Sequence, residues 1–220
     1  MSKLKILTID GPSASGKGSL SRNIAKHLGF KILDSGLLYR TYAYFSQSGS
    51  NIEEISNRIK NEISFSFNEN DVSILHKDKD ITSLLRSETT AKIASELSAL
   101  PKTREDLLTI QRDFYNQDGL VADGRDMGTV VFPKAALKIF LTASPEVRAK
   151  RRHLELQKRG QEVNMLDLIA DIELRDMKDR TRTLSPLIPA EDSVVIDSSN
   201  MSIDEVLSFT KKLTKKEFNK

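Results

Sequence analysis

The feature that most constrains this chain is a short run of small residues with a lysine, placed between a predicted strand and a predicted helix. Residues 11–17 read GPSASGK and match the pattern G-x-x-x-x-G-K. The β-branched run Lys5–Asp10 (KILTID) precedes them and predicts a strand. Backbone N–H groups of such a turn surround phosphate oxygens, while the following helix N-terminus and the lysine add positive charge. A flexible glycine turn is the alternative, but the flanking strand and helix favour a phosphate-binding loop.

The residues after the loop continue a strand–helix–strand pattern. Apolar residues recur at helical spacing at Leu20, Ile24, Ala25 and Leu28. Gly29 follows, where a helix C-terminus favours glycine, and residues 30–34 (FKILD) predict a second strand. A strand, glycine turn, helix and strand in this order predict the opening of an α/β fold with a parallel sheet.

Later segments extend this pattern. Strands are predicted at Gly119–Asp123, Leu137–Leu141 and Ser193–Asp197, and helices at Pro145–Gly160, Met165–Thr181 and from about Ile203. Ser202 and Glu205 have the spacing of a capping box at the start of the last helix. These elements extend the α/β pattern of the first residues.

The middle of the chain has a different periodicity. Apolar residues alternate at Ile63, Phe65 and Phe67 and again at Val72 and Ile74. The residues between the two runs, 68–71, read NEND and predict a turn. We therefore expect a small antiparallel hairpin within about 62–81, inserted into the main α/β unit.

Composition excludes several classes of protein. The chain of 220 residues has no cysteine, which excludes disulfides, thiolate metal sites and cysteine nucleophiles. Its residues are 38% hydrophobic, yet no run approaches the roughly 18 consecutive apolar residues of a membrane span. The first residues, MSKLKILTID, contain no apolar signal segment, so we expect a cytoplasmic protein.

The charge does not indicate a nucleic-acid partner. Lys and Arg total 34 against 31 Asp and Glu, which leaves a net charge of +3 and favours a mixed, solvated surface. Aromatic residues make up only 6%, with no tryptophan, so an aromatic-dotted basic face is not expected either.

Polar residues gather where predicted strands end. Asp34-Ser35-Gly36 closes the second strand, and Arg40 follows shortly after. Ligands of parallel sheets bind beyond the carboxyl ends of the strands, on the side of the phosphate loop. An N-cap at Ser35 with a surface Arg40 explains the same residues, and this segment alone does not decide between the two interpretations.

The segment 123–133, DGRDMGTVVFP, follows another predicted strand and has the composition of a ligand-binding loop. Arg125 can bind a phosphate through two N–H groups, and Asp126 can accept a hydrogen bond from an exocyclic amine such as cytosine N4. Asp123 lies at the strand end, where a carboxylate can hold Mg²⁺ through water.

Two more clusters give weaker signals. Residues 173–182, ELRDMKDRTR, place Arg175, Asp179 and Arg182 at i, i+4 and i+7, on one face of a predicted helix. The charge pattern alone favours an exposed helix laced with salt bridges. The segment from Ser95 to Arg104 carries no chemical signal of its own.

Taken together, the motifs resemble bacterial cytidylate kinases in order and nearly end to end. The matching segments are IDGPSASGKGSLS, LDSGLLYR, ADGRDMGTVVFP, KIFLTAS and RDMKDRTRTLSPLIPAEDSVVIDSS, of which ADGRDMGTVVFP is highly specific to that family. Lys17 is followed by Gly18 and only then by the Ser19 hydroxyl, which resembles nucleoside monophosphate kinases more than GTPases and leaves a direct contact of Ser19 with Mg²⁺ open.

The resemblance implies a single P-loop kinase domain over 1–220 with an α/β fold. Its P-loop NTPase core, a parallel β-sheet flanked by helices, would cover about 1–40, 85–146 and 183–220. A small antiparallel β insertion that binds the nucleoside monophosphate would cover about 41–84, and a short helical lid about 147–182.

The resemblance also implies the substrates, ATP with Mg²⁺ as donor and CMP or dCMP as acceptor, and their binding residues. ATP is assigned to Gly11, Pro12, Ser13, Ala14, Ser15, Gly16, Lys17, Gly18 and Ser19, with Arg148 and Arg151 from the arginine-bearing segment Val147–Gly160. The CMP phosphate is assigned to Ser35, Arg40, Arg125 and Arg182, the sugar to Arg175 and Asp179, and the cytosine to Ser95, Arg104 and Asp126.

The same resemblance assigns catalytic roles. Lys17, Arg125, Arg152 and Arg182 would stabilise the charge of the transferring group. No direct metal ligand is assigned, and Ser19 and Asp123 are the candidates to hold Mg²⁺, the latter through water. The family is expected to be monomeric, without nucleic-acid or membrane partners.

Other interpretations fit these residues less well. Adenylate, guanylate and shikimate kinases share the phosphate loop, but the acceptor motifs do not match theirs, and the chain has no zinc-type lid. A nucleotide-dependent switch protein would lack the separate acceptor arginines and would not turn over with a free monophosphate.

Overall fold

The computed structural model describes residues 3–67, 72–158 and 160–218, and the chain divides into two compact units. The first unit consists of Met1–Ile32 and Gln117–Lys220, and the second of Leu33–Asn116. The second unit is wider than the expected insertion of about 41–84, because it also contains the helices on either side of the hairpin.

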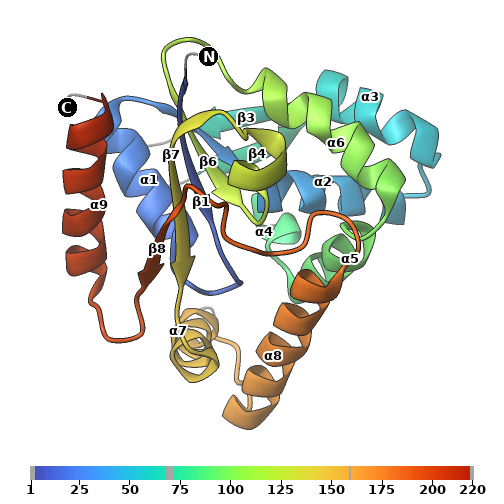
Figure 1. Ribbon diagram of the computed structural model, residues 1–220. Helices are drawn as coiled ribbons and strands as arrows, with labels where there is room; N and C mark the ends of the chain where they lie inside the picture. The colour runs from blue at the N-terminus through green and yellow to red at the C-terminus, as the bar shows by residue number, and fades with distance from the viewer. Residues whose placement is uncertain (1–2, 68–71, 159, 219–220) are drawn as a thin grey trace. The chain divides into compact units, whose positions relative to one another are not determined.

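The main sheet is parallel and has the strand order β2-β6-β1-β7-β8 (Figure 1). In chain order its strands are β1 (Leu4–Asp10), β2 (Lys31–Asp34), β6 (Leu120–Gly124), β7 (Ala135–Thr142) and β8 (Val194–Asp197). All five residues of β6 and the last five of β1 are buried without alternation, as expected for central strands covered on both faces. The expected α/β fold with a parallel sheet is confirmed.

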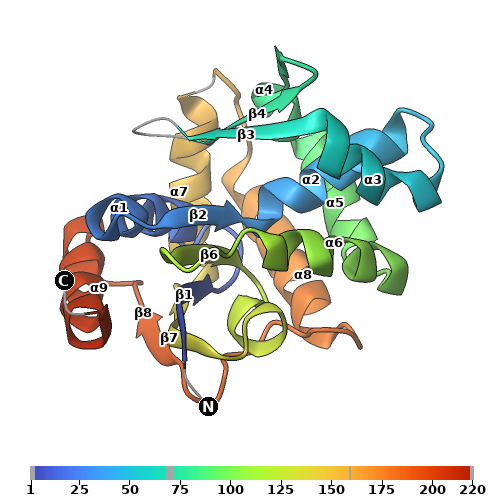
Figure 2. The same cartoon turned by 90° about the horizontal axis from the view of Figure 1, so that it is seen from above.

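Two helices of the first unit pack on this sheet, and two others pack on each other beyond the carboxyl ends of its strands (Figure 1). They are α1 (Lys17–Leu28), α7 (Pro145–Gln157), α8 (Met165–Thr181) and α9 (Ile203–Phe218), with a short π-helical turn, η1 (Met127–Val131), after β6. Helices α1 and α9 lie side by side on one face of the sheet (Figures 1 and 2).

Local signals set the ends of these helices as the sequence predicts. Gly29 adopts the left-handed conformation, with φ of 68°, and its N–H donates to the Ala25 carbonyl at the end of α1. At the start of α9, the Glu205 N–H donates to Ser202 Oγ at 3.2 Å, and the Ser202 N–H donates to Glu205 Oε2 at 2.8 Å. The capping box is therefore confirmed.

The second unit combines helices with a three-stranded antiparallel sheet. It contains α2 (Ser35–Gln47), α3 (Ile52–Glu62), β3 (Ile63–Phe67), β4 (Val72–His76), β5 (Lys79–Asp80), α4 (Thr82–Leu85), α5 (Glu88–Leu97) and α6 (Pro101–Asp113). Strands β3 and β4 pair from Ile63 with His76 to Phe67 with Val72, which confirms the hairpin. Its predicted NEND turn lies outside the described residues, and the short β5 was not expected.

Within the described ranges, no helix is both long and apolar enough to span a membrane.

The phosphate-binding loop is held close to the backbone of β7 at its first residue. Gly11 has φ of 149°, and a Cβ at this position would lie 2.0 Å from the Leu141 carbonyl oxygen. Because both the conformation and the space exclude a side chain, only glycine allows the loop to start at this point on the sheet.

We expect Gly11→Ala to lower the free energy of unfolding by about 2–3 kcal/mol. The alanine would adopt a strained conformation, and the backbone at Leu141 would have to move away from the new Cβ. Gly49→Ala is the matched control, because Gly49 has φ of 76° but no atom within 4 Å of its would-be Cβ. Gly49→Ala should lower the free energy of unfolding by only about 1 kcal/mol, the cost of placing an alanine in the left-handed conformation. Urea denaturation measures both losses, and equal losses would contradict the clash with Leu141.

Candidate active site

The loop after β1 has the backbone conformation of an anion-binding turn. Ala14 has φ of 57° and Gly16 has φ of 96°, so residues with positive φ alternate with ordinary ones along the loop. Gly16 is also the N-cap of α1 and carries no side chain to cap the first-turn N–H groups. These N–H groups and the helix dipole favour a phosphate at this point.

Lys17 is buried at the centre of this loop. Its Nζ donates to the Pro12 carbonyl oxygen at 2.7 Å and contacts Ser15 Oγ at 3.5 Å. Burial, then repulsion from Arg125, lowers the pKa of Lys17 to about 7, although nearby carboxylates oppose the shift. Arg175 adds to the repulsion, so the loop lysine shares one electrostatic environment with two arginines assigned to the acceptor.

Asp10, the last residue of β1, joins the phosphate loop to the segment after β6. Its carboxylate accepts hydrogen bonds from the Met127 N–H at 2.8 Å and the Gly128 N–H at 2.7 Å. Burial raises the pKa of Asp10 to about 6, while the two hydrogen bonds lower it. Sequence reasoning assigned Asp10 no role, although its place at a carboxyl strand end beside the loop was a signal.

Arg125, Asp179 and Arg182 form one cluster in the first unit. Arg125 Nε donates to Asp179 Oδ2 at 3.2 Å, and Arg182 NH1 lies 3.6 Å from Asp179 Oδ1. Residues predicted from two separate motifs are thus brought together around one carboxylate. Two guanidinium groups, a type of side chain that binds phosphate through paired N–H groups, thus contact the two oxygens of one carboxylate.

One expectation about this cluster is wrong. Arg182 does not continue the helical face of Arg175 and Asp179, because α8 ends at Thr181 and Arg182 is extended, with φ of −63° and ψ of 139°. Its Nε donates to the Ser185 carbonyl oxygen at 2.6 Å. The side chain reaches Asp179 from the chain that leaves the helix.

The arginines of α7 point into the first unit. Arg151 NH1 donates to the Ser15 carbonyl oxygen at 3.0 Å, and its NH2 donates to the Ser198 carbonyl oxygen at 2.8 Å. Arg148 donates to the Ser13 carbonyl oxygen at 3.2 Å. Arg152 NH1 contacts Glu155 on the same helix, at 2.6 Å. Two of the three arginines therefore bind carbonyl oxygens of the phosphate loop itself.

Asp126 and Asp123 flank Arg125 and are both buried. The Asp126 carbonyl oxygen accepts from the N–H groups of Val130 and Val131, which starts the turn η1, and the Asp126 charge helps to raise the pKa of Asp10. The carboxylate predicted to recognise cytosine thus lies near the phosphate loop.

The residues expected near a metal ion offer few donors. Asp123 Oδ2 would lie 3.6 Å from a Cβ on Gly18, so this carboxylate reaches the first turn of α1, where Ser19 lies. Among the described residues, no group of three or more His, Asp or Glu side chains could hold a metal. One carboxylate and one hydroxyl beside a phosphate loop fit Mg²⁺, which binds mainly through phosphates and keeps several waters.

The second unit holds four predicted site residues, two of them on α2. Ser35 is buried, and its Oγ accepts from Gln111 Nε2 at 2.8 Å. Arg40 NH1 donates to the carbonyl oxygens of Leu85, at 2.9 Å, and Ser87, at 3.4 Å. Gln111 was missed by sequence reasoning, because nothing local marks a contact across so many residues.

The other two lie on α5 and α6. Arg104 NH1 donates to the Ser98 carbonyl oxygen at 2.9 Å, and its guanidinium carbon lies 5.9 Å from the ring centre of Tyr39. The Ser95 carbonyl oxygen accepts from Ser98 Oγ at 2.7 Å. Ser95 and Arg104 are thus joined through Ser98.

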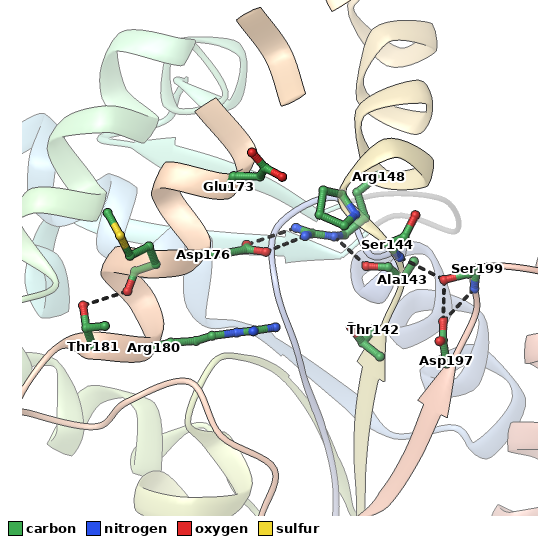
Figure 3. A pocket seen from close by; sticks show the side chains of 12 residues that line it. Thr142, Ala143, Ser144, Arg148, Glu173, Asp176, Arg180, Thr181, Asp197 and Ser199 are labelled. Carbon is green, nitrogen blue, oxygen red and sulfur yellow. Dashed lines mark hydrogen bonds and ion pairs between the residues drawn. The ribbon is translucent and has the colours of Figure 1, made fainter. Parts of the chain in front are cut away.

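A pocket of about 630 Å³ lies within the first unit (Figure 3). Its wall is formed by the end of β7, the start of α7, one side of α8 and the segment that includes Asp197 and Ser199. Arg148 and Asp176 form part of this wall and point toward one another (Figure 3).

Comparison with known proteins gives a family match over nearly the whole chain. The family model described as cytidylate kinase matches residues 7–216. A cytidylate kinase of Shewanella sp. (strain MR-4) is 46% identical over 210 residues, covering 92% of this chain and 91% of that protein. Cytidylate kinase 1 of Haemophilus influenzae is 43% identical over 209 residues, covering 92% and 90%.

Solved structures of lower identity share the fold. The protein TT1252 of Thermus thermophilus has a TM-score of 0.50 at 14% identity, covering 99% of this chain and 98% of its own. An uncharacterized protein of Eubacterium ventriosum has a TM-score of 0.52 at 12% identity, covering 97% and 99%. At such identities the likeness describes the architecture alone.

The lowered pKa of Lys17 predicts proton uptake when a polyphosphate binds the loop. At pH 8 the free amine is largely neutral, because its pKa is about 7. A bound anion favours the charged amine and raises this pKa, so the lysine should take up a proton when tripolyphosphate binds. Calorimetry in two buffers of different ionisation enthalpy measures the net number of protons taken up. Tripolyphosphate can itself release a proton on binding, so Lys17→Met is the reference: the wild type should take up more protons than this variant, and equal net uptake by the two would contradict the prediction.

Proposed function

The chain belongs to the cytidylate kinase family, and we propose how its own residues transfer the γ-phosphoryl group of ATP to CMP or dCMP, giving CDP or dCDP and ADP. The observation that carries the proposal is the buried Lys17 on the loop, with Arg125 and Arg175 close enough to lower its pKa. Cations assigned to the donor and to the acceptor phosphate thus repel one another, and phosphate groups between them would relieve that repulsion.

We propose that ATP binds residues 11–19 with its phosphates on the backbone N–H groups of the loop. Lys17 would leave the Pro12 carbonyl and contact the phosphates. Arg151 and Arg152 are the proposed lid arginines on the donor side. Mg²⁺ bound with ATP would neutralise phosphate charge, with Ser19 and Asp123 as the residues to hold it, Asp123 through water.

We propose acceptor residues from the same resemblance. Arg125, Arg182, Ser35 and Arg40 would hold the CMP phosphate. Arg175 and Asp179 would hold the sugar hydroxyls, and Asp126, Ser95 and Arg104 the cytosine. The paired guanidinium groups around Asp179 support the phosphate assignment, since arginine binds two phosphate oxygens at once.

In the transfer, a phosphate oxygen of CMP attacks the γ-phosphorus while the bond from that phosphorus to the leaving ADP oxygen breaks. No covalent intermediate with the protein is needed, so catalysis rests on alignment and on neutralising charge. Lys17, Arg125, Arg152 and Arg182 are the proposed catalytic groups. Closure of the lid, about 147–182, would exclude water as a competing acceptor.

The setting of the reaction follows from the same resemblance. We propose that the protein works in the cytoplasm, in pyrimidine nucleotide metabolism, and as a monomer. We propose no nucleic-acid or membrane partner, because its charge is nearly balanced.

The test is ADP formation from ATP and Mg²⁺ in a coupled assay, with CMP, dCMP, UMP, AMP, GMP and shikimate compared side by side. CMP and dCMP should give the highest kcat/KM. A different preferred acceptor would overturn the roles of Ser95, Arg104 and Asp126 but keep the phosphate loop. Binding of ATP with no turnover of any acceptor would favour a nucleotide-dependent switch protein.

Lys17→Ala should abolish turnover while CMP still binds, because the lysine acts on the transferring group and not on the acceptor. The coupled assay measures turnover, and calorimetry measures CMP binding. Lys26→Ala, an exposed lysine of the same helix, should retain wild-type turnover. An active Lys17→Ala variant, or a folded one that no longer binds CMP, would contradict the assignment.

Asp126→Asn should narrow the preference for CMP over UMP by about 1–3 kcal/mol, since a carboxylate accepts from the cytosine amine and repels the uracil carbonyl oxygen. The ratio of kcat/KM for the two substrates measures this preference. The exposed Asp113→Asn serves as the control. An unchanged ratio in a folded Asp126→Asn variant would mean that another residue recognises the base.

A further inference from the structure

Arg148 is the largest fully buried side chain in the part of the chain that the structure describes, with 1% of its surface exposed. Burial of a charge is costly unless the charge is paired and hydrogen-bonded. Arg148 meets both conditions. NH1 donates to Asp176 Oδ1 at 3.0 Å, NH2 pairs with Asp176 Oδ2, and Nε donates to the Ala143 carbonyl oxygen at 2.9 Å.

The fourth contact gives this pair a connection to the site. Arg148 NH1 also donates to the carbonyl oxygen of Ser13, inside the phosphate loop. Asp176 lies on α8 beside Arg175 and three residues before Asp179. One guanidinium therefore links the turn between β7 and α7 with the helix that carries two residues assigned to the acceptor (Figure 3). It also links both of them to the phosphate loop.

The Ser13 carbonyl matters because of how a phosphate loop works. Its N–H groups must converge on the anion, and a donor that binds a loop carbonyl holds the peptide in the orientation that this convergence needs. Ser13 is half-buried. Arg148 supplies that donor at Ser13, and Arg151 supplies it at Ser15. Two arginines of α7 thus hold the conformation of the phosphate loop through its carbonyl groups.

We propose that the Arg148–Asp176 pair is a positioning element of the donor site, which holds the phosphate loop in its phosphate-receiving conformation through the Ser13 carbonyl. Arg148 acts through the loop and does not itself contact a phosphate, since its guanidinium is committed to Asp176 and two carbonyl groups. This role replaces the direct phosphate contact assigned to Arg148 by resemblance, and it rests on the proposed function.

An ion pair that only stabilises the fold and one that positions the loop predict different effects of double substitution on ATP binding. Replacing both partners of a buried ion pair by apolar residues often leaves stability unchanged, whereas removing one partner strands a buried charge. If the pair only stabilises the fold, the double variant regains activity together with stability. If it positions the loop, stability returns and nucleotide binding does not, because Ser13 has lost its donor.

The experiment compares Arg148→Met, Asp176→Asn and the double variant Arg148→Met with Asp176→Leu. We expect both single variants to have a lower Tm, and the double variant to recover it. In the double variant KM for ATP should stay at least about tenfold above wild type, the fold-change that corresponds to about 1.4 kcal/mol. Amides of residues 11–17 should also exchange with solvent faster. Lys150→Met, an exposed cation on the same helix, should match wild type.

Three outcomes would overturn the proposal. A double variant with wild-type Tm and KM for ATP within twofold of wild type would make the pair structural only. An unchanged KM for ATP in Asp176→Asn, beside a raised one in Arg148→Met, would mean that Arg148 contacts phosphate directly. If the double variant does not recover its Tm, the test uses Asp176→Asn at a temperature below its Tm, where it is folded. An unchanged KM for ATP and an unchanged amide exchange rate of residues 11–17 in this variant would then overturn the proposal.

Failure of the proposed function would be visible separately. A wild-type protein that forms no CDP from CMP would refute the cytidylate kinase assignment. Titration of the same variants with ATP by calorimetry would still measure how the pair affects the phosphate loop. A tenfold weaker Kd in the double variant would support the positioning role whatever the acceptor is.

Discussion

The site depends on one buried carboxylate, that of Asp10. It accepts from the N–H groups of Met127 and Gly128, and so fixes the segment after β6 against the end of β1. Parallel neighbouring strands already bring their carboxyl ends to one edge of the sheet. The pairing of Asp10 with Gly124 in the sheet fixes where the phosphate loop and Arg125 begin. The two hydrogen bonds of Asp10 then hold the residues after Arg125, Met127 and Gly128, against the end of β1.

Burial of charge explains why this region suits a polyphosphate. Desolvation raises the pKa of Asp10 to about 6 and lowers that of Lys17 to about 7, so each group is less charged than on the surface. Arg125 and Arg175 strengthen the shift at Lys17 and cannot lose their own protons. Two fixed positive charges therefore lie close enough to Lys17 to disfavour its charged form. Phosphate groups bound among these cations would offset that repulsion and favour the charged lysine.

The sequence predicted what periodicity and short motifs determine, and failed where contacts join distant residues. The strand, loop and helix over Leu4–Leu28 follow from local patterns, and so do α8 and the β3–β4 hairpin. The hydrogen bonds of Asp10 and the Arg148–Asp176 pair do not follow from local patterns, because they join elements that are far apart in the sequence. In the sequence alone, each of these residues looks like an ordinary residue of a strand or of an exposed helix. Arg182 was misplaced for another reason: the i, i+4, i+7 spacing extended the helical face by one residue past Thr181, where the helix was itself predicted to end and does end.

The arginines of α7 show that the number of positive charges in a segment does not predict what each side chain contacts. By sequence, Arg148, Arg151 and Arg152 are equivalent cations for donor phosphates. In the fold, the planar guanidinium groups of Arg148 and Arg151 donate to backbone carbonyl oxygens, and that of Arg148 also pairs with a carboxylate. Lysine could supply the charge but not this geometry, because its donors radiate from one point. At Arg148 the planar shape of the guanidinium therefore matters as much as its charge, because this side chain bridges a carboxylate and two carbonyl groups.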